Sequence, residues 1–472
     1  MGITDRYINP KAIKHVVLSV ALVSAVLLAV MKYDDPFRIS ILLPLTYLAA
    51  ASLWINPQHI RGIGCIFLFG MYCFRMCVLP VICAWGNFYL EPERHVYIDY
   101  FWAAIILMCI ECVIVLGALR YYSRLYSRRA DKFRIYSQGD THGNNMLFMF
   151  AKALFVMYLA LFIAHPNFLT DHYRFLIVDS IDEMLEGDKA MSFLYSYGKL
   201  YYLLSIMDSV ARPAMIYIFV GWLLKKSRAG IIFSVLIGVI IMLWVTDRRI
   251  LSFLTGVICF IQILLHIKSR KVKFIVYSSI ASLALMTIAY CFYALPNPEM
   301  YARTFTRYFS GPQLTAINIT VYMNFIQTPL DFLRRLFNDF QILTGLFGSM
   351  KGIYLAGIVS NGVRSLWTPA IIGAVQYFHV FGFIMLIPPV KFLVYADYVS
   401  MHSRSDAEKM MMNYLTVSLS VYMVMYTLEL IYYHIIARGG FFFLLLWLNR
   451  HFEIVNYSRI KFFGRCRYKY EQ

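Results

Sequence analysis

Charged side chains are scarce in this 472-residue chain: they make up only 15% of it, whereas hydrophobic residues make up 60%. A soluble core cannot absorb so large an apolar share. The chain also lacks a P-loop, a glycine-rich turn after a strand, the His-Glu-x-x-His metal motif and a nucleophile elbow. These absences argue against a nucleotide-driven pump and against the common soluble enzyme classes.

Cysteine usage excludes a disulfide framework. The chain has nine cysteines, an odd number, and eight of them lie in apolar segments, where a thiol behaves as a small hydrophobe. Cys109 and Cys112 have the spacing of a metal-binding pair, but no second pair accompanies them. We therefore predict no metal and no cofactor.

What the chain does have is about a dozen apolar segments of roughly bilayer length. Only helices satisfy all their backbone hydrogen bonds in hydrocarbon without closing a barrel. We therefore predict an all-α, polytopic transmembrane helical bundle with about twelve spans. The predicted spans are 15–31, 39–55, 63–84, 98–118, 147–164, 200–223, 230–245, 250–267, 274–295, 367–396, 411–436 and 439–449. The tenth is long enough to be broken or tilted.

The distribution of lysine and arginine predicts the orientation of these spans. With the N-terminus in the cytoplasm, all the strongly basic runs face one side: Arg120–Arg134, Lys225–Arg228, Lys268–Lys273 and Arg450–Lys469. Both termini are then cytoplasmic. The formal net charge of +18 follows from this bias beside anionic lipid headgroups, so no nucleic-acid partner is needed to explain it.

Two long loops are predicted on the outer side, at 165–199 and 296–366. They divide the chain into spans one to nine (1–295), a large extracytoplasmic loop (296–366), and spans ten to twelve with a basic tail (367–472). Within the second loop, Thr328 is a predicted N-cap, Pro329 suits the first helical position and Asp331 the first turn. Apolar residues then recur on one face, so this loop is predicted to contain an amphipathic helix.

Arginines gather at the predicted outer rim. Arg248 and Arg249 lie in a very short connection between two spans, and Arg303 and Arg307 are four residues apart, on one face of a helix. The planar guanidinium group suits phosphate oxygens, so these four arginines predict a cradle for a diphosphate. The alternative is that they are interfacial anchors that reach lipid headgroups.

Charges within the spans are costly and therefore candidates for function. Arg75 and Arg212 either form ion pairs, with Glu111 or Asp208, or contact an anionic ligand. Asp397 lies near a predicted span end, where it would reach the interface. His379 is a candidate proton acceptor, although a lone histidine among apolar residues is more often a hydrogen-bonded core residue.

Three short stretches resemble the oligosaccharide repeat-unit polymerases of bacterial O-antigen and capsule synthesis (Wzy-type), which are relatives of the O-antigen ligases. Tyr308-Phe-Ser-Gly-Pro312 is similar to the element that opens the family's late outer loop. Asn361 through Phe383 resembles the element that leads into the next span. Thr246-Asp-Arg-Arg249 resembles the arginine turn between two middle spans. His379-Val380 departs from the family pattern, which has an acid before Phe381-Gly382, and Pro312 replaces a second glycine.

The resemblance implies a metal-independent glycosyltransferase in the bacterial cytoplasmic membrane. Its donor and acceptor would be oligosaccharides on undecaprenyl diphosphate, joined on the outer side, and a chain-length regulator is a further candidate partner beside membrane lipid. The arginines at the diphosphate would be Arg248, Arg249, Arg303 and Arg307. The proton acceptor would be His379 or Glu299. The other substrate contacts would be Arg75, Arg212, Gln313 and Arg364.

Two other functions also fit a protein of many spans. A flippase or transporter of lipid-linked oligosaccharides would need cationic residues along a cavity that reaches both faces of the membrane. A membrane O-acyltransferase would need a histidine deep in the bundle, a role for which His379 is the candidate. The concentration of arginines at one rim, beneath a long loop, favours the polymerase over the flippase.

Overall fold

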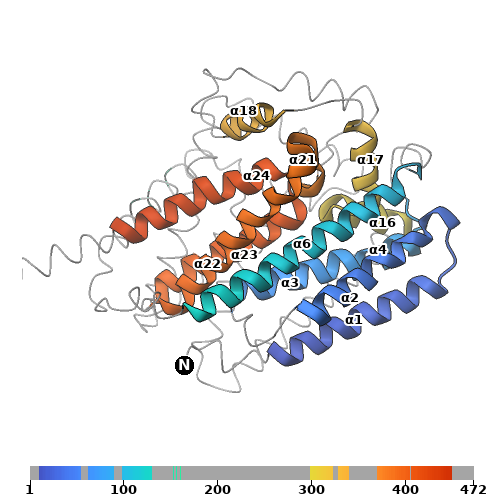
Figure 1. The fold of residues 1–472 in the computed structure, drawn as a ribbon, viewed down its shortest axis with the longest axis horizontal. Coiled ribbons are helices and arrows are strands. Elements are labelled where there is room, and N and C mark those ends of the chain that lie inside the picture. The colour runs from blue at the N-terminus through green and yellow to red at the C-terminus, as the bar shows by residue number, and fades with distance from the viewer. Residues whose placement is uncertain are drawn as a thin grey trace, which may run out of the picture. The chain divides into compact units, whose positions relative to one another are not determined.

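The computed structural model describes residues 10–54, 62–89, 98–129, 298–322, 328–339, 369–403 and 406–448, with the single positions 153, 156 and 160. In these ranges the chain forms helices and no strand (Figure 1). Five of the helices described are long and apolar enough to cross a membrane, and two shorter apolar helices accompany them. The predicted all-α fold is therefore confirmed for the described part, and its apolar helices suggest a membrane protein. The predicted spans between 147 and 295 lie outside the described residues.

The elements follow one another in a simple order. The α-helices are α1 (Pro10–Val30), α2 (Leu42–Trp54), α3 (Ile63–Cys73), α4 (Leu79–Trp85), α6 (Phe101–Arg128), α16 (Pro298–Phe309), α17 (Pro312–Tyr322), α18 (Pro329–Asp339), α21 (Ala370–Phe378), α22 (Ile387–His402), α23 (Asp406–Met425) and α24 (Leu428–Tyr433). Tighter 3₁₀ segments span Asp35–Ile41 and His379–Leu386, and wider π-helical turns span Phe74–Val78 and His434–Gly439.

The chain divides into two compact units. The first comprises Met1–Phe133, Ile275–Met401 and Thr416–Ile436, and the second comprises Arg134–Phe274, His402–Leu415 and Ala437–Gln472. In the second unit, the Ser403 hydroxyl donates a hydrogen bond to Glu408. All the contacts described below lie within the first unit.

Two predicted boundaries differ in the structure. The fourth span, predicted at 98–118, continues as a helix to Arg128. Along this extension Arg120 donates from Nη1 to the Leu53 carbonyl, 3.0 Å away, near the C-terminal end of α2. Such a cation stabilises the carbonyls that a helix end leaves without partners. Nearer the C-terminus, one helix ends at Met425 and the next begins at Leu428. The boundary between the spans predicted at 411–436 and 439–449 therefore lies earlier in the structure, at 425–428.

Proline explains the irregular turns inside the apolar helices. Pro80 has no N–H to donate, and its ring crowds the carbonyl four residues back. The helix widens just before it into the π-helical turn Phe74–Val78, where the Leu79 N–H bonds the Phe74 carbonyl. Pro389 likewise cannot bond the Met385 carbonyl, which instead accepts a hydrogen bond from Tyr432 Oη at 2.9 Å.

The tenth predicted span is broken, as its length suggested. His379 has a left-handed backbone (φ 51°) between α21 and the 3₁₀ segment. A Cβ atom at Gly382 would collide with the Ala374 carbonyl, so the 3₁₀ segment lies tightly against the end of α21. Only glycine permits this approach. The consequence is an exposed corner at His379, whose side chain is open.

The amphipathic helix predicted in the late loop is present as α18. Its N-terminus is closed by a reciprocal cap: the Thr328 N–H donates to the Asp331 carboxylate at 2.9 Å, and the Asp331 N–H faces Thr328 Oγ1 at 3.4 Å. Phe332 and Leu336 are buried, and the Phe332 ring packs edge-on against Tyr377 and Phe378 of α21. The helix thus lies on α21 and α24, as Figure 1 shows.

Candidate functional site

Helix α16 packs along α4. At its start, Gly86 lies against the Pro298 carbonyl, and the Trp85 ring stacks on Tyr301 with centroids 5.6 Å apart. One turn further, Cys83 Sγ and Thr306 Oγ1 are 3.1 Å apart. At its end, Phe309 reaches Phe74. Residue numbers fall on one helix as they rise on the other, so the two helices are antiparallel.

Helix α16 ends beside Arg75, which lies near the middle of the apolar helix Ile63–Trp85. The helix is interrupted there at Ser310, whose backbone is left-handed (φ 49°), and the next helix, α17, begins at Pro312. Helix α17 then packs on α6 and α21, with residues 311–318 buried. We call α16, the Ser310–Gly311 break and α17 the re-entrant hairpin. This stretch belongs to the loop predicted at 296–366, and the structure packs α17 against the apolar helices α6 and α21.

The break is held by short-range contacts. The Gly311 N–H donates to the Thr306 carbonyl at 3.0 Å, and Thr315 Oγ1 donates to the Gly311 carbonyl at 3.0 Å. A Cβ atom at Gly311 would press against Thr306. Proline at the first position of α17 needs no hydrogen-bond acceptor there. The sequence Ser-Gly-Pro therefore ends one helix and starts the next within two residues.

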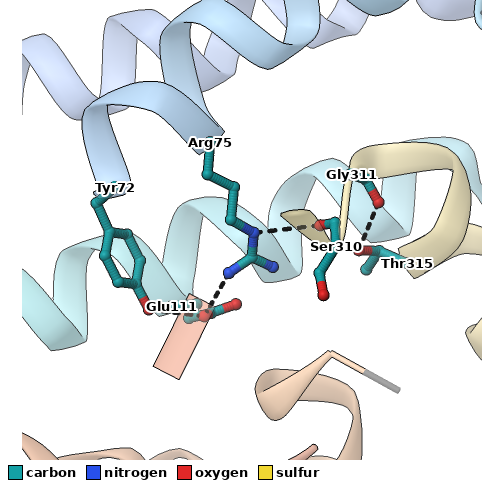
Figure 2. Close-up of polar contacts among 6 residues, drawn as sticks. All are labelled: Tyr72, Arg75, Glu111, Ser310, Gly311 and Thr315. Atoms are coloured by element: carbon teal, nitrogen blue, oxygen red, sulfur yellow. Dashed lines mark hydrogen bonds and ion pairs between the residues drawn. The ribbon is translucent and has the colours of Figure 1, made fainter. Parts of the chain in front are cut away.

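Arg75 joins the hairpin to the membrane helices. Its Nη1 lies 2.7 Å from Glu111 Oε1 on α6, and its Nε donates to the Ser310 carbonyl at 3.1 Å, as Figure 2 shows. Tyr72 Oη donates to the same Glu111 oxygen at 2.7 Å. The Arg75 and Glu111 side chains are both 1% exposed. The ion pair cancels both charges in hydrocarbon, and the arginine satisfies a carbonyl that the helix break leaves free.

A second set of polar contacts surrounds the same break. Thr306 Oγ1 donates to Gln313 Oε1 at 3.0 Å, across the turn. Several buried polar atoms of the hairpin and of the ion pair have no hydrogen-bond partner among the described residues: Arg75 Nη2, Glu111 Oε2, Ser310 Oγ and Gln313 Nε2. Buried polar atoms are rarely left in this state, so this cluster is the candidate site.

The structure brings three of the predicted site residues to the hairpin. Arg303 is buried on α16, Gln313 lies at the start of α17, and Arg75 contacts the turn between them. Of the two explanations for Arg75, the ion pair with Glu111 is confirmed. Sequence reasoning missed Tyr72 and Ser310. Tyr72 lies three residues before Arg75 on the same helix, a spacing that places both on one face.

The remaining predicted residues lie elsewhere or outside the described part. Glu299 is exposed in the first turn of α16, and His379 is exposed at the corner after α21. Arg307 belongs to α16, but its side chain is outside the described residues. The other predicted arginines also lie outside them: Arg212, Arg248, Arg249 and Arg364.

Asp397 was predicted to lie near a span end and to reach the membrane interface. The structure buries it at 1% exposure against the start of α3, which is also the start of the apolar helix Ile63–Trp85. Its carboxylate accepts hydrogen bonds from the Gly64 N–H at 3.1 Å and the Cys65 N–H at 2.6 Å. An acid at a helix N-terminus satisfies free N–H groups and complements the helix dipole. Asp397 therefore caps a helix more than three hundred residues earlier in the chain.

Among the residues that the structure describes, the His, Cys, Asp and Glu side chains form no group of three or more placed to hold a metal ion. Cys109 accepts a hydrogen bond from Thr46 Oγ1 at 3.2 Å, and Cys112 is buried. The Cys109–Cys112 pair thus behaves as part of the helix packing of α6.

Comparisons with protein-family models, with curated proteins and with solved structures give no match for this chain.

Proposed function

We propose that this membrane protein is a polymerase that joins oligosaccharide repeat units carried on undecaprenyl diphosphate, on the outer side of a bacterial cytoplasmic membrane. One observation carries the proposal. The segment Arg303–Gln313, one of the three that resemble the Wzy-type polymerases, contains the helix break of the re-entrant hairpin, and the Ser310 carbonyl there accepts a hydrogen bond from the buried Arg75. Broken helices in membrane proteins mark substrate sites, because irregular backbone is tolerated there only when it lines a protein or aqueous interior.

The proposed reaction needs charge stabilisation and a proton acceptor. The bond between the donor's anomeric carbon and the lipid diphosphate breaks, and the anomeric carbon bonds the acceptor's hydroxyl oxygen. Arg303, held on α16, would bind the departing diphosphate beside Arg248, Arg249 and Arg307. A fixed guanidinium group stabilises that developing charge without reorganisation. The hydroxyl proton would pass to Glu299 or His379, which are both open to solvent or lipid.

Helix α18 suits a cover for the sugar. Its apolar face is seated on α21 and α24 by Phe332, and its outer face carries Asp331 and Arg334, 3.5 Å apart. A polar outer face above an apolar inner face belongs at a membrane surface. In the proposal this helix closes over the outer end of the re-entrant hairpin.

The first prediction concerns Arg303→Ala. At equal expression, cells with this variant are expected to lose long surface polymer and to display single repeat units. The reason is that no arginine at position 303 then stabilises the negative charge on the leaving diphosphate. Loss of one such contact costs a factor of about 10² or more in rate. Polysaccharide ladders on a gel measure the effect. Arg38→Ala is the matched control, since Arg38 is 74% exposed and bonds only Asp35 among the contacts seen.

Arg303→Lys refines the result. Lysine keeps the charge but loses the planar fork, so shortened ladders are expected rather than none. A full-length ladder from Arg303→Ala would contradict the role of this arginine. Purified protein supplied with lipid-linked repeat units alone tests the activity itself: ladders support a polymerase, and translocation without ladders would identify a flippase.

A further inference from the structure

The tip of the re-entrant hairpin holds more buried polar atoms than the described residues satisfy. The guanidinium group of Arg75 bonds both Glu111 and Ser310, so both residues lie directly beside it. Among the described residues, Arg75 Nη2, Glu111 Oε2 and Ser310 Oγ have no partner. Figure 2 shows the Ser310 hydroxyl and the free Glu111 oxygen on the same side of the guanidinium group.

A buried polar atom without a hydrogen-bond partner is energetically unfavourable, and more so in a membrane, where no bulk water reaches it. Arg75, Glu111 and Ser310 are each at most 1% exposed. A buried cluster of this kind is stable when each member is satisfied and costly when it is not. Among the described residues nothing satisfies these atoms, so the site suits an occupant that brings its own hydrogen-bonding group.

The chemistry of the site selects the occupant. Arg75 Nη2 only donates hydrogen bonds, and an ionised Glu111 Oε2 only accepts them. Because the two charges already cancel in the ion pair, an added anion would meet an unbalanced carboxylate. An ammonium group, in turn, has no lone pair to accept from Arg75. A hydroxyl group donates and accepts through one atom, so it satisfies both residues and Ser310 together.

We propose that the tip of the re-entrant hairpin binds a neutral hydroxyl group between Arg75 Nη2, Glu111 Oε2 and Ser310 Oγ. A saccharide hydroxyl and a buried water molecule share this chemistry. The saccharide as the source rests on the proposed function, whereas the hydroxyl site itself does not.

The test compares two buried serines in the full-length protein in lipid nanodiscs. Ser310→Ala removes a hydroxyl from the site. Ser40→Ala is the matched control, because Ser40 is also fully buried with its Oγ unpartnered among the described residues, but lies in the Asp35–Ile41 segment. An occupied site predicts that Ser310→Ala lowers the midpoint of thermal unfolding, by about 2 °C for one lost hydrogen bond. Ser40→Ala should leave the midpoint unchanged or raise it.

Added probes then distinguish the source of the hydroxyl. Glucose, galactose and N-acetylglucosamine are titrated against wild type, Ser310→Ala and Ser40→Ala, with inorganic phosphate as the anionic probe. A sugar that stabilises wild type and Ser40→Ala, but not Ser310→Ala, identifies a saccharide site. A destabilising Ser310→Ala with no sugar effect identifies bound water, and this result stands whether or not the protein makes polymer.

Two results would overturn the proposal. The first is a Ser310→Ala midpoint equal to or above that of wild type, which means that the hydroxyl has no partner. The second is stabilisation by phosphate that depends on Ser310, which means that the site takes an anion. If Ser310→Ala fails to fold, Ser310→Gly, which tolerates the left-handed backbone at this position, replaces it in the sugar and phosphate titrations.

Discussion

Among the buried carboxylates of the described residues, Asp397 and Glu111 are the most deeply buried, and they are satisfied in different ways. Asp397 accepts two backbone N–H groups at the start of α3, and neither of its oxygens is left over. Glu111 shares one oxygen between Arg75 and Tyr72, and its other oxygen has no partner among the described residues. Burial of charge is the same in both regions, so burial alone does not identify a functional site. The unused hydrogen-bonding capacity separates them.

The two regions also differ in what surrounds the acid. An added Cβ atom at Gly62 would overlap the Asp397 carboxylate, and one at Gly64 would overlap Thr416. Ser420 donates a hydrogen bond to the Gly64 carbonyl at 2.9 Å. This is close, complete packing of three helices. Glu111 faces a helix break in the re-entrant hairpin. The first region resembles a structural joint, whereas the second combines a charge pair with irregular backbone, as ligand sites in membranes do.

The largest expected effect comes from breaking the ion pair on one side. Arg75→Ala leaves the Glu111 charge unpaired in hydrocarbon and frees the Ser310 carbonyl, which predicts a loss of about 3–5 kcal/mol in stability. Thermal unfolding of the purified protein measures it. The double variant Arg75→Met with Glu111→Leu should lose much less, because no buried charge remains. Equal losses in the single and double variants would mean that the pair does not hold the hairpin.

A smaller but clear effect is expected where Asp397 caps the start of α3. Asp397→Ala removes the acceptor for two N–H groups at the start of α3 and should cost about 2–4 kcal/mol, since each hydrogen bond to a charged group contributes ~1.5–3 kcal/mol before relaxation. Hydrogen exchange of the peptide covering residues 62–70 should rise, while that of residues 303–318 stays as in wild type. Asp35→Ala, at a carboxylate that is 86% exposed, is the control. Faster exchange in both peptides of Asp397→Ala would contradict the expectation that Asp397 stabilises only the start of α3.

The smallest effect is expected at the cap of α18. Thr328→Ala removes the hydroxyl that bonds Asp331 at 2.7 Å, and a lost cap of this kind costs about 0.5–1 kcal/mol. Because Thr328 is exposed, the loss should be confined to α18 and appear as faster hydrogen exchange in residues 329–339. Thr328→Ser keeps the hydroxyl and should behave as wild type. An unchanged exchange rate in Thr328→Ala would show that packing of Phe332 alone seats the helix.

Patterns within a few residues of one another were enough to predict several elements. Apolar runs predicted the helix Ile63–Trp85 almost to its ends, and the Thr328-Pro-Leu-Asp331 signature predicted where α18 starts. Both depend on hydrogen bonds and burial that a short segment satisfies by itself. The same local patterns predicted a span at 98–118 but not the continuation of α6 to Arg128, because its last turns are basic yet remain helical, with contacts such as that of Arg120 with Leu53.

The candidate site could be predicted only in part. Arg75, Arg303 and Gln313 were named from their charge and from the resemblance of their segment, but the choice between Glu111 and Asp208 as the partner of Arg75 stayed open. Nothing in the sequence around 298–322 showed that these residues enter the bundle, because α16 has a polar composition that suits an interface as well. Its burial follows from antiparallel packing on α4.

Apolar length, proline positions and capping residues thus decided on their own that the chain is a helical membrane protein, and where several helices begin or break. The tertiary structure alone decided that Arg75 meets Glu111 and Ser310, and that Asp397 caps α3. The physical reason is separation: these contacts join residues 36 to 333 positions apart. A buried charge shows that some partner is needed, but only the packing of helices determines which residue becomes that partner.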